Sequence, residues 1–313
     1  MAREPVVNAL ADEVERYLTI RRAVGFKLAR VEKLLADYLR YLDRVGDTTI
    51  TVDNALAWAC LPAAGTSSWR GHRLSVVRAF ARHLHAIDPT HQIPPAGLLP
   101  TRSNRAVPYL YSDDEITALM AAARTLSSPL RAATLETLVG LLAVTGMRIG
   151  EALRLDRDDI DIASAVIRVR QSKFGKARDI PVHATTIDRL AAYARRRDEL
   201  CPHPKDPSWF VSLAGTRLLY CNVHLAWQGL VRQAGLVPRA AGCRPRPHDL
   251  RHGFATTTVL DWYRTGADVT ARMPLLSTYL GHVDPAATYW YLSAAPELLA
   301  LAADRLPPLE TQQ

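Results

Sequence analysis

Paired cysteines and long apolar segments are both missing from this sequence. Its four cysteines lie far apart, without CxxC spacing, at Cys60, Cys201, Cys221 and Cys243. Because structural zinc sites usually need closely spaced ligands, this argues against one and favours reduced thiols. The apolar stretch at residues 135–144 is far shorter than the roughly 20 residues of a membrane span, and no signal peptide pattern opens the chain. We therefore expect a cytoplasmic protein without a membrane segment.

The composition is that of a globular protein with an excess of positive charge. The 313 residues are 48% hydrophobic and 22% charged, with a net charge of +8. This length exceeds one ordinary domain, so we expect two, and the apolar content argues against disorder. Excess positive charge favours a polyanionic partner such as nucleic acid, although many basic proteins bind none.

Residues 1–100 are predicted to form a helical domain. A helix is expected after Thr51, with Asp53 as its N-cap. The last helix of this domain has a partly basic polar face that includes Arg73 and Arg78, which is either a solvated surface or a phosphate-contacting one. Apolar residues recur at helical spacing in three segments: Leu10, Val14, Tyr17 and Leu18; Leu34, Leu35, Tyr38, Leu39 and Leu42; Leu74, Val77, Phe80, Ala81 and Leu84.

A linker and a second domain follow. Prolines interrupt the helical pattern, and we place an extended, partly basic linker at residues 101–112 and the second domain at residues 113–313. Ser112 precedes three acidic residues, as expected of an N-cap at a helix start. Residues 135–144 are apolar nearly all round, which predicts a buried helix.

A small β-hairpin is predicted within the second domain. Residues 165–170 alternate like a half-buried strand, and residues 178–182 follow a polar turn as a second strand. Helical spacing returns after residue 185, whereas residues 201–244 show no clear pattern. The predicted fold is therefore mainly α with a small β-hairpin, in the α+β class.

Two motifs place cations where they could meet a phosphate. Arg148, in TGMRIGEAL, follows the buried helix at a glycine-flanked junction before another helix. Backbone N–H groups at a helix start favour an anion, but an ordinary surface arginine fits too. Lys173 and Lys176 lie in the hairpin turn QSKFGK, where they could reach a DNA groove or remain solvated.

Two further motifs contain histidine with arginine or tyrosine. In HDLRHGFAT, His248 and Arg251 are three positions apart and share a helical face, as suits a phosphate-binding, proton-handling pair. His248 and His252 also form HxxxH, but no suitable third metal ligand lies nearby. His282, in LGH, and Tyr291 lie nine positions apart. Taken singly, each of these last two could be a core or interface residue.

Together these residues resemble the tyrosine recombinases, in particular the Xer recombinases and phage lambda integrase. TGMRIGEAL is similar to the first-arginine box of that family, HDLRHGFAT to its HxLRH box, and LGH with Tyr291 to its third box. The resemblance covers residues 113–295 clearly and residues 10–90 more loosely. It implies a helical core-binding domain at residues 1–100 and a catalytic domain at residues 113–313 with a C-terminal docking helix.

The resemblance implies a covalent mechanism. Tyr291 would attack a backbone phosphate and form a 3′-phosphotyrosyl bond, with Tyr289 as a rival nucleophile. Phosphodiester energy is conserved in that bond, so neither ATP nor another cofactor is expected, and no P-loop occurs in the sequence. No metal is expected either.

The same resemblance assigns roles to five further side chains. Arg148 and Arg251 would hold the non-bridging phosphate oxygens, which suits their planar forks. His282 would bond the same phosphate, and His248 would accept the tyrosine proton. Lys173 would protonate the leaving 5′-oxygen.

The implied partners are a double-stranded DNA recombination site and, in the synaptic complex, a homotetramer. Residues 296–306 have an apolar face that we expect to dock on a neighbouring protomer. Lys176 is a rival for the role of the catalytic lysine and is otherwise a DNA contact. The other expected DNA contacts are Arg73, Arg78, Arg102 and Arg105.

Other functions stay open at this point. A type IB topoisomerase-like enzyme would share the phosphotyrosine chemistry, and a non-catalytic DNA-binding regulator would share the fold. A basic helical module without any DNA role is a third alternative. Within recombinases, the sequence leaves integration, transposition and dimer resolution undecided. A bacterial source is expected.

Overall fold

A computed structural model describes residues 4–61, 65–100, 107–170, 177–240, 242–282 and 288–289, with the backbone alone at residues 4–9. The chain divides into two compact units, Met1–Arg105 and Ala106–Gln313. Each unit has its own hydrophobic core. Within the described residues, no helix is both long and apolar enough to cross a membrane.

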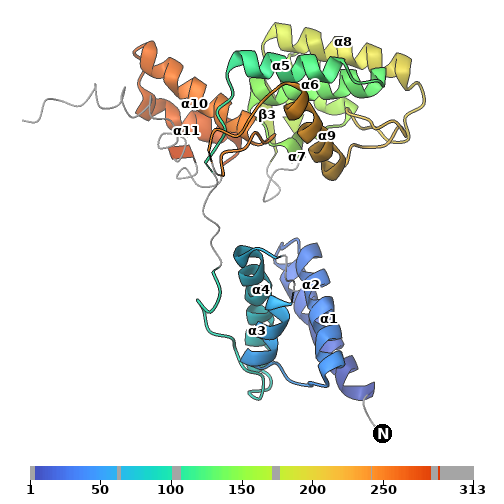
Figure 1. The fold of residues 1–313 in the computed structure, drawn as a ribbon, viewed down its shortest axis with the longest axis vertical. Helices are drawn as coiled ribbons and strands as arrows, with labels where there is room; N and C mark the ends of the chain where they lie inside the picture. Colours follow the sequence, from blue (N-terminus) through green and yellow to red (C-terminus); the bar gives the residue numbers. More distant parts are fainter. Residues whose placement is uncertain are drawn as a thin grey trace, which may run out of the picture. The chain divides into compact units, whose positions relative to one another are not determined.

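The first unit is helical. It contains α1 (Glu4–Ala23), α2 (Ala29–Val45), α3 (Val52–Cys60) and α4 (Ser67–His85), drawn in blue to teal in Figure 1. The predicted apolar positions of α1 and α4 are all buried, as are those of α2 apart from the partly buried Leu39. Trp58 and Tyr38 fill the centre of this core, with their rings 5.1 Å apart. The helical periodicity is confirmed.

The predicted N-cap of α3 is wrong. Thr51, and not Asp53, caps the helix, because the Thr51 side chain accepts from the Asn54 backbone N–H. The Asn54 side chain accepts in return from the Thr51 N–H, which completes a capping box. Asn54 also accepts a hydrogen bond from the Tyr38 hydroxyl, so the cap is tied to the core.

The second unit is mostly helical with one small sheet (Figure 1). Its helix α6 packs against α5, α8 and α10, and α10 packs against α11. The helices are α5 (Asp113–Arg124), α6 (Pro129–Thr145), α7 (Ile149–Ala152), α8 (Ala184–Leu200), α9 (Tyr220–Gln233), α10 (Asp249–Arg264) and α11 (Val269–Leu280), with a 3₁₀ turn η1 at Arg157–Asp159.

The sheet contains the predicted hairpin and one more strand. Strands β1 (Ile160–Asp161), β2 (Val166–Val169) and β3 (Arg178–Pro181) are antiparallel in that order. Ile167 pairs with both Ile160 and Ile180, and all three are buried. The two-residue β1 is too short to show an alternating pattern, which is why the sequence did not reveal it.

Of the other predictions for this unit, some are confirmed and one helix was not predicted. Ser112 caps α5 in a capping box with Glu115, as predicted. The buried helix is confirmed but begins earlier, at Pro129, with Ser128 as its N-cap. The region 201–244 contains α9, which was missed; its buried residues Val223, Trp227 and Leu230 do have helical spacing.

Candidate active site

Arg148 lies at the junction between α6 and α7. Helix α6 ends at Gly146 with φ of +57°, and Arg148 is the N-cap of α7. Its backbone N–H donates to Glu151 Oε2 at 3.0 Å, and its Nη1 donates to Glu151 Oε1 at 2.9 Å. Its Nη2 donates to the backbone oxygen of Gly281 at 3.1 Å. The guanidinium is therefore fixed on two sides.

Glu151 is the buried anion of this site. Its side chain is only 1% exposed and also pairs with Arg178, the first residue of β3. Burial alone would raise the pKa of this carboxyl, but hydrogen bonds and charge from Arg178 and Arg148 outweigh burial and lower it to about 2. Glu151 is therefore ionised at pH 7.

Arg251, on the first turns of α10, ties three segments together. Its Nη1 donates to the Gly146 oxygen at 2.9 Å, and its Nη2 donates to the Leu280 oxygen at 2.8 Å. The same Nη2 lies 2.7 Å from His282 Nε2. Arg251 is 2% exposed. A buried arginine of this kind needs such partners, because an unpaired buried charge is very costly.

His282 follows the C-terminus of α11. Because a guanidinium can only donate, His282 Nε2 accepts from Arg251 and the neutral ring carries its proton on Nδ1. Nδ1 then donates to Thr288 Oγ1, at 2.6 Å. Burial, followed by the charges of Arg251 and Arg148, lowers the pKa of His282 to about 4. In the DNA-free protein this ring is neutral at pH 7.

His248 lies at the start of α10, three positions before Arg251. The residue is exposed, and its ring meets that of His252 edge-on with centroids 5.0 Å apart. Desolvation of the ring by surrounding atoms, and then the charge of Arg251, lower the pKa of His248. A neutral imidazole is the form that can accept a proton.

Two glycines allow the backbone to approach this site closely. A Cβ at Gly146 would lie 2.5 Å from the Phe254 ring, and one at Gly281 would lie 2.7 Å from Arg178 Nη1. Gly281 also has φ of +68°, the left-handed conformation that ends α11. Larger residues at either position would displace the segments that hold Arg251 and Arg148.

The structure thus brings together three of the six predicted catalytic residues, Arg148, Arg251 and His282, at the end of α11. It places His248 at the start of α10, three positions before Arg251. It adds Glu151 and Arg178, which the sequence analysis did not single out. Glu151 had one signal, its position three residues after the N-cap, where a capping-box glutamate stands. Tyr289 is described and is 48% exposed. Outside the described residues lie Lys173, Lys176, Arg102, Arg105, Tyr291 and the segment 296–306.

Arg73 and Arg78, expected to contact DNA, are 6% and 8% exposed. Arg73 donates to the Trp58 backbone oxygen at 2.9 Å, and its guanidinium lies 3.7 Å from the Trp58 ring centroid. Arg78 donates to the backbone oxygens of Pro94 and Pro95. These internal contacts favour a structural role for both arginines over the predicted phosphate contacts.

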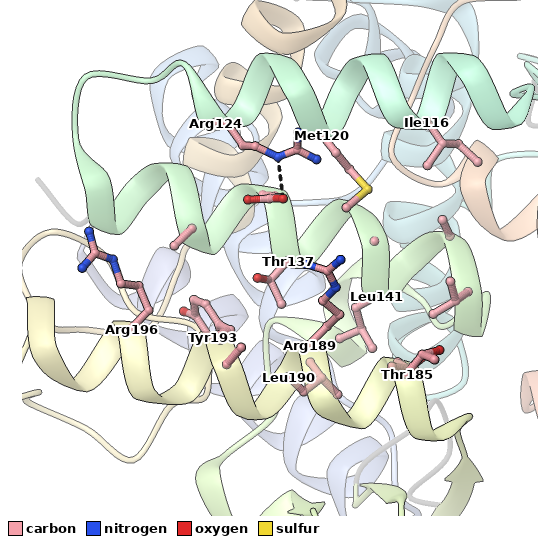
Figure 2. A pocket seen from close by; sticks show the side chains of 17 residues that line it. Ile116, Met120, Arg124, Thr137, Leu141, Thr185, Arg189, Leu190, Tyr193 and Arg196 are labelled. Atoms are coloured by element: carbon pink, nitrogen blue, oxygen red, sulfur yellow. Dashed lines mark hydrogen bonds and ion pairs between the residues drawn. The ribbon is translucent and has the colours of Figure 1, made fainter.

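In the described part of the chain, no three His, Cys, Asp or Glu side chains gather as a metal site would require. A groove of about 480 Å³ runs between α5, α6 and α8 (Figure 2), where Arg124 pairs with Glu136. Its lining includes none of the catalytic candidates, so it is separate from the arginine site. Glu151 also lines a hollow of about 380 Å³ beside β2.

Comparison with known proteins identifies the family. Residues 110–297 match the phage integrase family. A putative integrase/recombinase of Sinorhizobium fredii, y4rB, is 44% identical over 306 residues, which cover 96% of this chain and 98% of that protein. The tyrosine recombinase XerC of Azotobacter vinelandii is 32% identical over 235 residues, covering 75% of this chain and 72% of XerC.

Solved structures show the same fold. The Tn1549 transposon integrase in complex with transposon right end DNA has a TM-score of 0.64 at 16% identity, covering 94% of this chain and 98% of that one. A lambda integrase tetramer bound to a Holliday junction has a TM-score of 0.61 at 18% identity, covering 90% and 76%. The predicted mainly α fold with a small sheet is confirmed. The chain belongs to the phage integrase family and is a tyrosine-type site-specific recombinase.

Proposed function

We propose that this recombinase cleaves and rejoins double-stranded DNA through a 3′-phosphotyrosyl bond to Tyr291, without metal or ATP. The observation that carries this proposal is the convergence of Arg148, Arg251 and His282 at the C-terminus of α11. Side chains from three separate helical junctions meet there. Two cations and an imidazole in one place suit a single phosphate with developing negative charge.

Each described side chain has a chemical task in this mechanism. Arg148 and Arg251 stabilise the pentavalent phosphorane through its non-bridging oxygens. Without DNA, His282 Nε2 accepts a hydrogen bond from Arg251. A bound phosphate oxygen would replace this contact. Its negative charge would favour the protonated ring, which then donates to the phosphate. His248, with its lowered pKa, accepts the proton of the Tyr291 hydroxyl. Lys173 protonates the leaving 5′-oxygen.

The two units have separate tasks. We assign DNA binding to residues 1–100 and catalysis to residues 113–313, with residues 101–112 as the linker that carries Arg102 and Arg105. Strand exchange between two DNA sites needs four active sites, and one structural relative is a lambda integrase tetramer bound to a Holliday junction. We therefore assign a homotetramer to the synaptic complex, with residues 296–306 docking on a neighbouring protomer. This DNA chemistry belongs in the bacterial cytoplasm.

The nucleophile can be tested by trapping. DNA that flanks the native gene supplies candidate sites, and a nicked suicide substrate built on the cleaved site should leave the protein covalently attached to the 3′ end. Tyr291→Phe should form no adduct, whereas the neighbouring control Tyr289→Phe should form it normally. An adduct with Tyr291→Phe disproves the assignment of the nucleophile. Relaxation of a supercoiled plasmid without the site favours a topoisomerase-like activity instead.

The assembly has a separate test. Truncation after Ser293 should leave DNA binding by single protomers intact and abolish the tetramer on two DNA sites, as measured by light scattering of the purified complex. A truncated chain that still assembles as a tetramer contradicts the docking role of residues 296–306.

A further inference from the structure

We propose that Arg178 is a positioning residue for DNA cleavage, acting through Glu151 and the C-terminus of α11 on the two groups that meet the phosphate, Arg148 and His282. This inference rests on the function proposed above. It concerns a residue on strand β3, outside the three motifs that identify the family, and it assigns to that residue a defined electrostatic task.

The Arg178 guanidinium is fixed by two different segments. Its Nη2 and Nη1 donate to the two carboxylate oxygens of Glu151, at 2.8 and 3.2 Å. Its Nε donates to the Tyr279 backbone oxygen at 2.8 Å. The side chain is 11% exposed, and that of Glu151 is 1% exposed. A forked, mostly buried pair of this kind is geometrically specific, so lysine cannot reproduce it fully.

Arg178 has an electrostatic effect on Arg148 through the shared carboxylate. Glu151 accepts from the Nη1 of Arg148 as well as from Arg178, so one buried anion lies between two cations. If Glu151 were paired with Arg148 alone, the two charges would cancel and the pair would attract a phosphate weakly. With Arg178 present, the triad has a net charge of +1. Arg178 therefore leaves the charge of Arg148 available to an anion.

Arg178 also belongs to a row of arginines at the end of α11. Three consecutive carbonyls, those of Tyr279, Leu280 and Gly281, accept from Arg178, Arg251 and Arg148 in turn. The last carbonyls of a helix lack partners within it and have a partial negative charge, so cations stabilise them. His282 comes directly after this row. Its position is thus set by all three arginines together.

The position of Arg178 in the chain links this row to the lysine hairpin. It is the first residue of β3 and follows Lys176 by two positions and Lys173 by five. The return strand of the hairpin is consequently anchored to the same carboxylate that holds Arg148. A single side chain connects the segment that carries the proposed general acid with the segments that bind the phosphate.

The test compares single-turnover adduct formation on the suicide substrate with DNA affinity for each variant. Arg178→Gln should slow adduct formation about 10- to 100-fold, the size of effect that outer-shell partners of ligating groups have on activity. DNA affinity should change much less, because it is the sum of many other phosphate contacts. Arg178→Lys keeps the charge and should lie between wild type and Arg178→Gln. The matched control is Arg168→Gln, because Arg168 is exposed on β2 and pairs with Asp179 across the sheet. It should stay within about twofold of wild type, as expected for an exposed ion pair.

The electrostatic argument makes a stronger prediction about a double variant. In Arg178→Gln the buried Glu151 cancels Arg148, whereas Arg178→Gln/Glu151→Gln restores a net charge of +1. The double variant should therefore form adduct faster than Arg178→Gln. A double variant no faster than Arg178→Gln, or an Arg178→Gln chain that cleaves within twofold of wild type, overturns the inference.

Two measurements distinguish a failure of this inference from a failure to fold and from a failure of the proposed function. Thermal unfolding without DNA identifies the variants that fold. If Arg178→Gln does not fold, the inference is tested with the double variant alone. A double variant that cleaves within about tenfold of wild type supports the inference. A double variant that folds but does not cleave overturns it. If wild type itself forms no adduct, or forms one that does not need Tyr291, the proposed function fails before Arg178 is tested.

Discussion

Arg251 Nη2 lies 2.7 Å from His282 Nε2, and this contact fixes the protonation state of the histidine in the DNA-free protein. The arginine donates, so the imidazole accepts and is neutral. The pKa of His282 is lowered to about 4 by burial and then by the charges of Arg251 and Arg148. The pH dependence of stability follows directly from this contact.

The first prediction concerns stability against pH. The folded-state pKa of His282 is about 4, against 6.5 for the ordinary imidazole. Between pH 4 and 6.5 the unfolded chain binds a proton at His282 that the folded chain does not bind. The folded state is therefore destabilised as pH falls from 6.5 towards 4, and above pH 6.5 this loss of stability is absent. His282→Gln should flatten the rise of melting temperature over this window. The control His203→Gln, at an exposed position, should retain it; an unchanged slope in His282→Gln contradicts the prediction.

The second prediction separates close approach from backbone strain. Gly281→Ala should lower the free energy of unfolding by about 1–2 kcal/mol, because alanine is strained at this positive φ. The added Cβ would also lie 2.7 Å from Arg178 Nη1 and should push that side chain away. Gly266 has a similar φ of +72° with nothing within 4 Å of the added Cβ. Gly266→Ala should therefore show the strain alone. Denaturant unfolding and adduct formation measure both effects, and equal adduct rates for the two variants would refute the contact with Arg178.

The third prediction concerns Thr288. This buried side chain accepts from His282 Nδ1 and so holds the ring and its tautomer. Thr288→Val should slow adduct formation by roughly tenfold, as expected for loss of a group that orients a histidine, without weakening DNA binding. Thr288→Ser keeps the hydroxyl and should retain most activity. Equal loss in both variants would indicate that packing, and not the hydrogen bond, matters.

The fourth prediction tests the role of Arg73. Its guanidinium is held by Trp58 and Asp37 within the first unit. Arg73→Met should destabilise the protein by about 1–3 kcal/mol, because it leaves the buried Trp58 backbone oxygen without this donor. It should leave the salt dependence of DNA binding unchanged. The control for stability is Arg82→Met, at an exposed position on the same helix. A salt slope reduced by about one unit in Arg73→Met would instead assign it a phosphate contact.

Local sequence patterns predicted much of this fold, because helix burial and helix capping depend on residues a few positions apart. The spacing of Leu74, Val77 and Leu84 identified the buried face of α4, and Ser112 with Glu115 marked the start of α5. Contacts distant in sequence were not predictable in this way. The burial of Arg73 depends on Asp37 and Trp58, which come from other helices. A basic face on α4 looks the same in sequence whether its arginines are buried or solvated.

The candidate site shows the same division. The motifs identified Arg148, Arg251 and His282, because their residue types and order are specific to one family. Arg178 had no such signal: its partners Glu151 and Tyr279 lie 27 and 101 positions away. Helix α9 is a different case, since its buried residues do have helical spacing, but prolines and glycines on either side obscure the pattern.

The row of arginines along the end of α11 also bears on how tightly this recombinase can hold DNA. Each arginine side chain has rotamer entropy of about 2 kcal/mol when it moves freely. Here Arg148, Arg178 and Arg251 are already immobilised on backbone oxygens before any substrate arrives. Ordering these side chains is thus part of folding and not of association. The site is preorganised, so binding of the phosphate need not be weakened by freezing them.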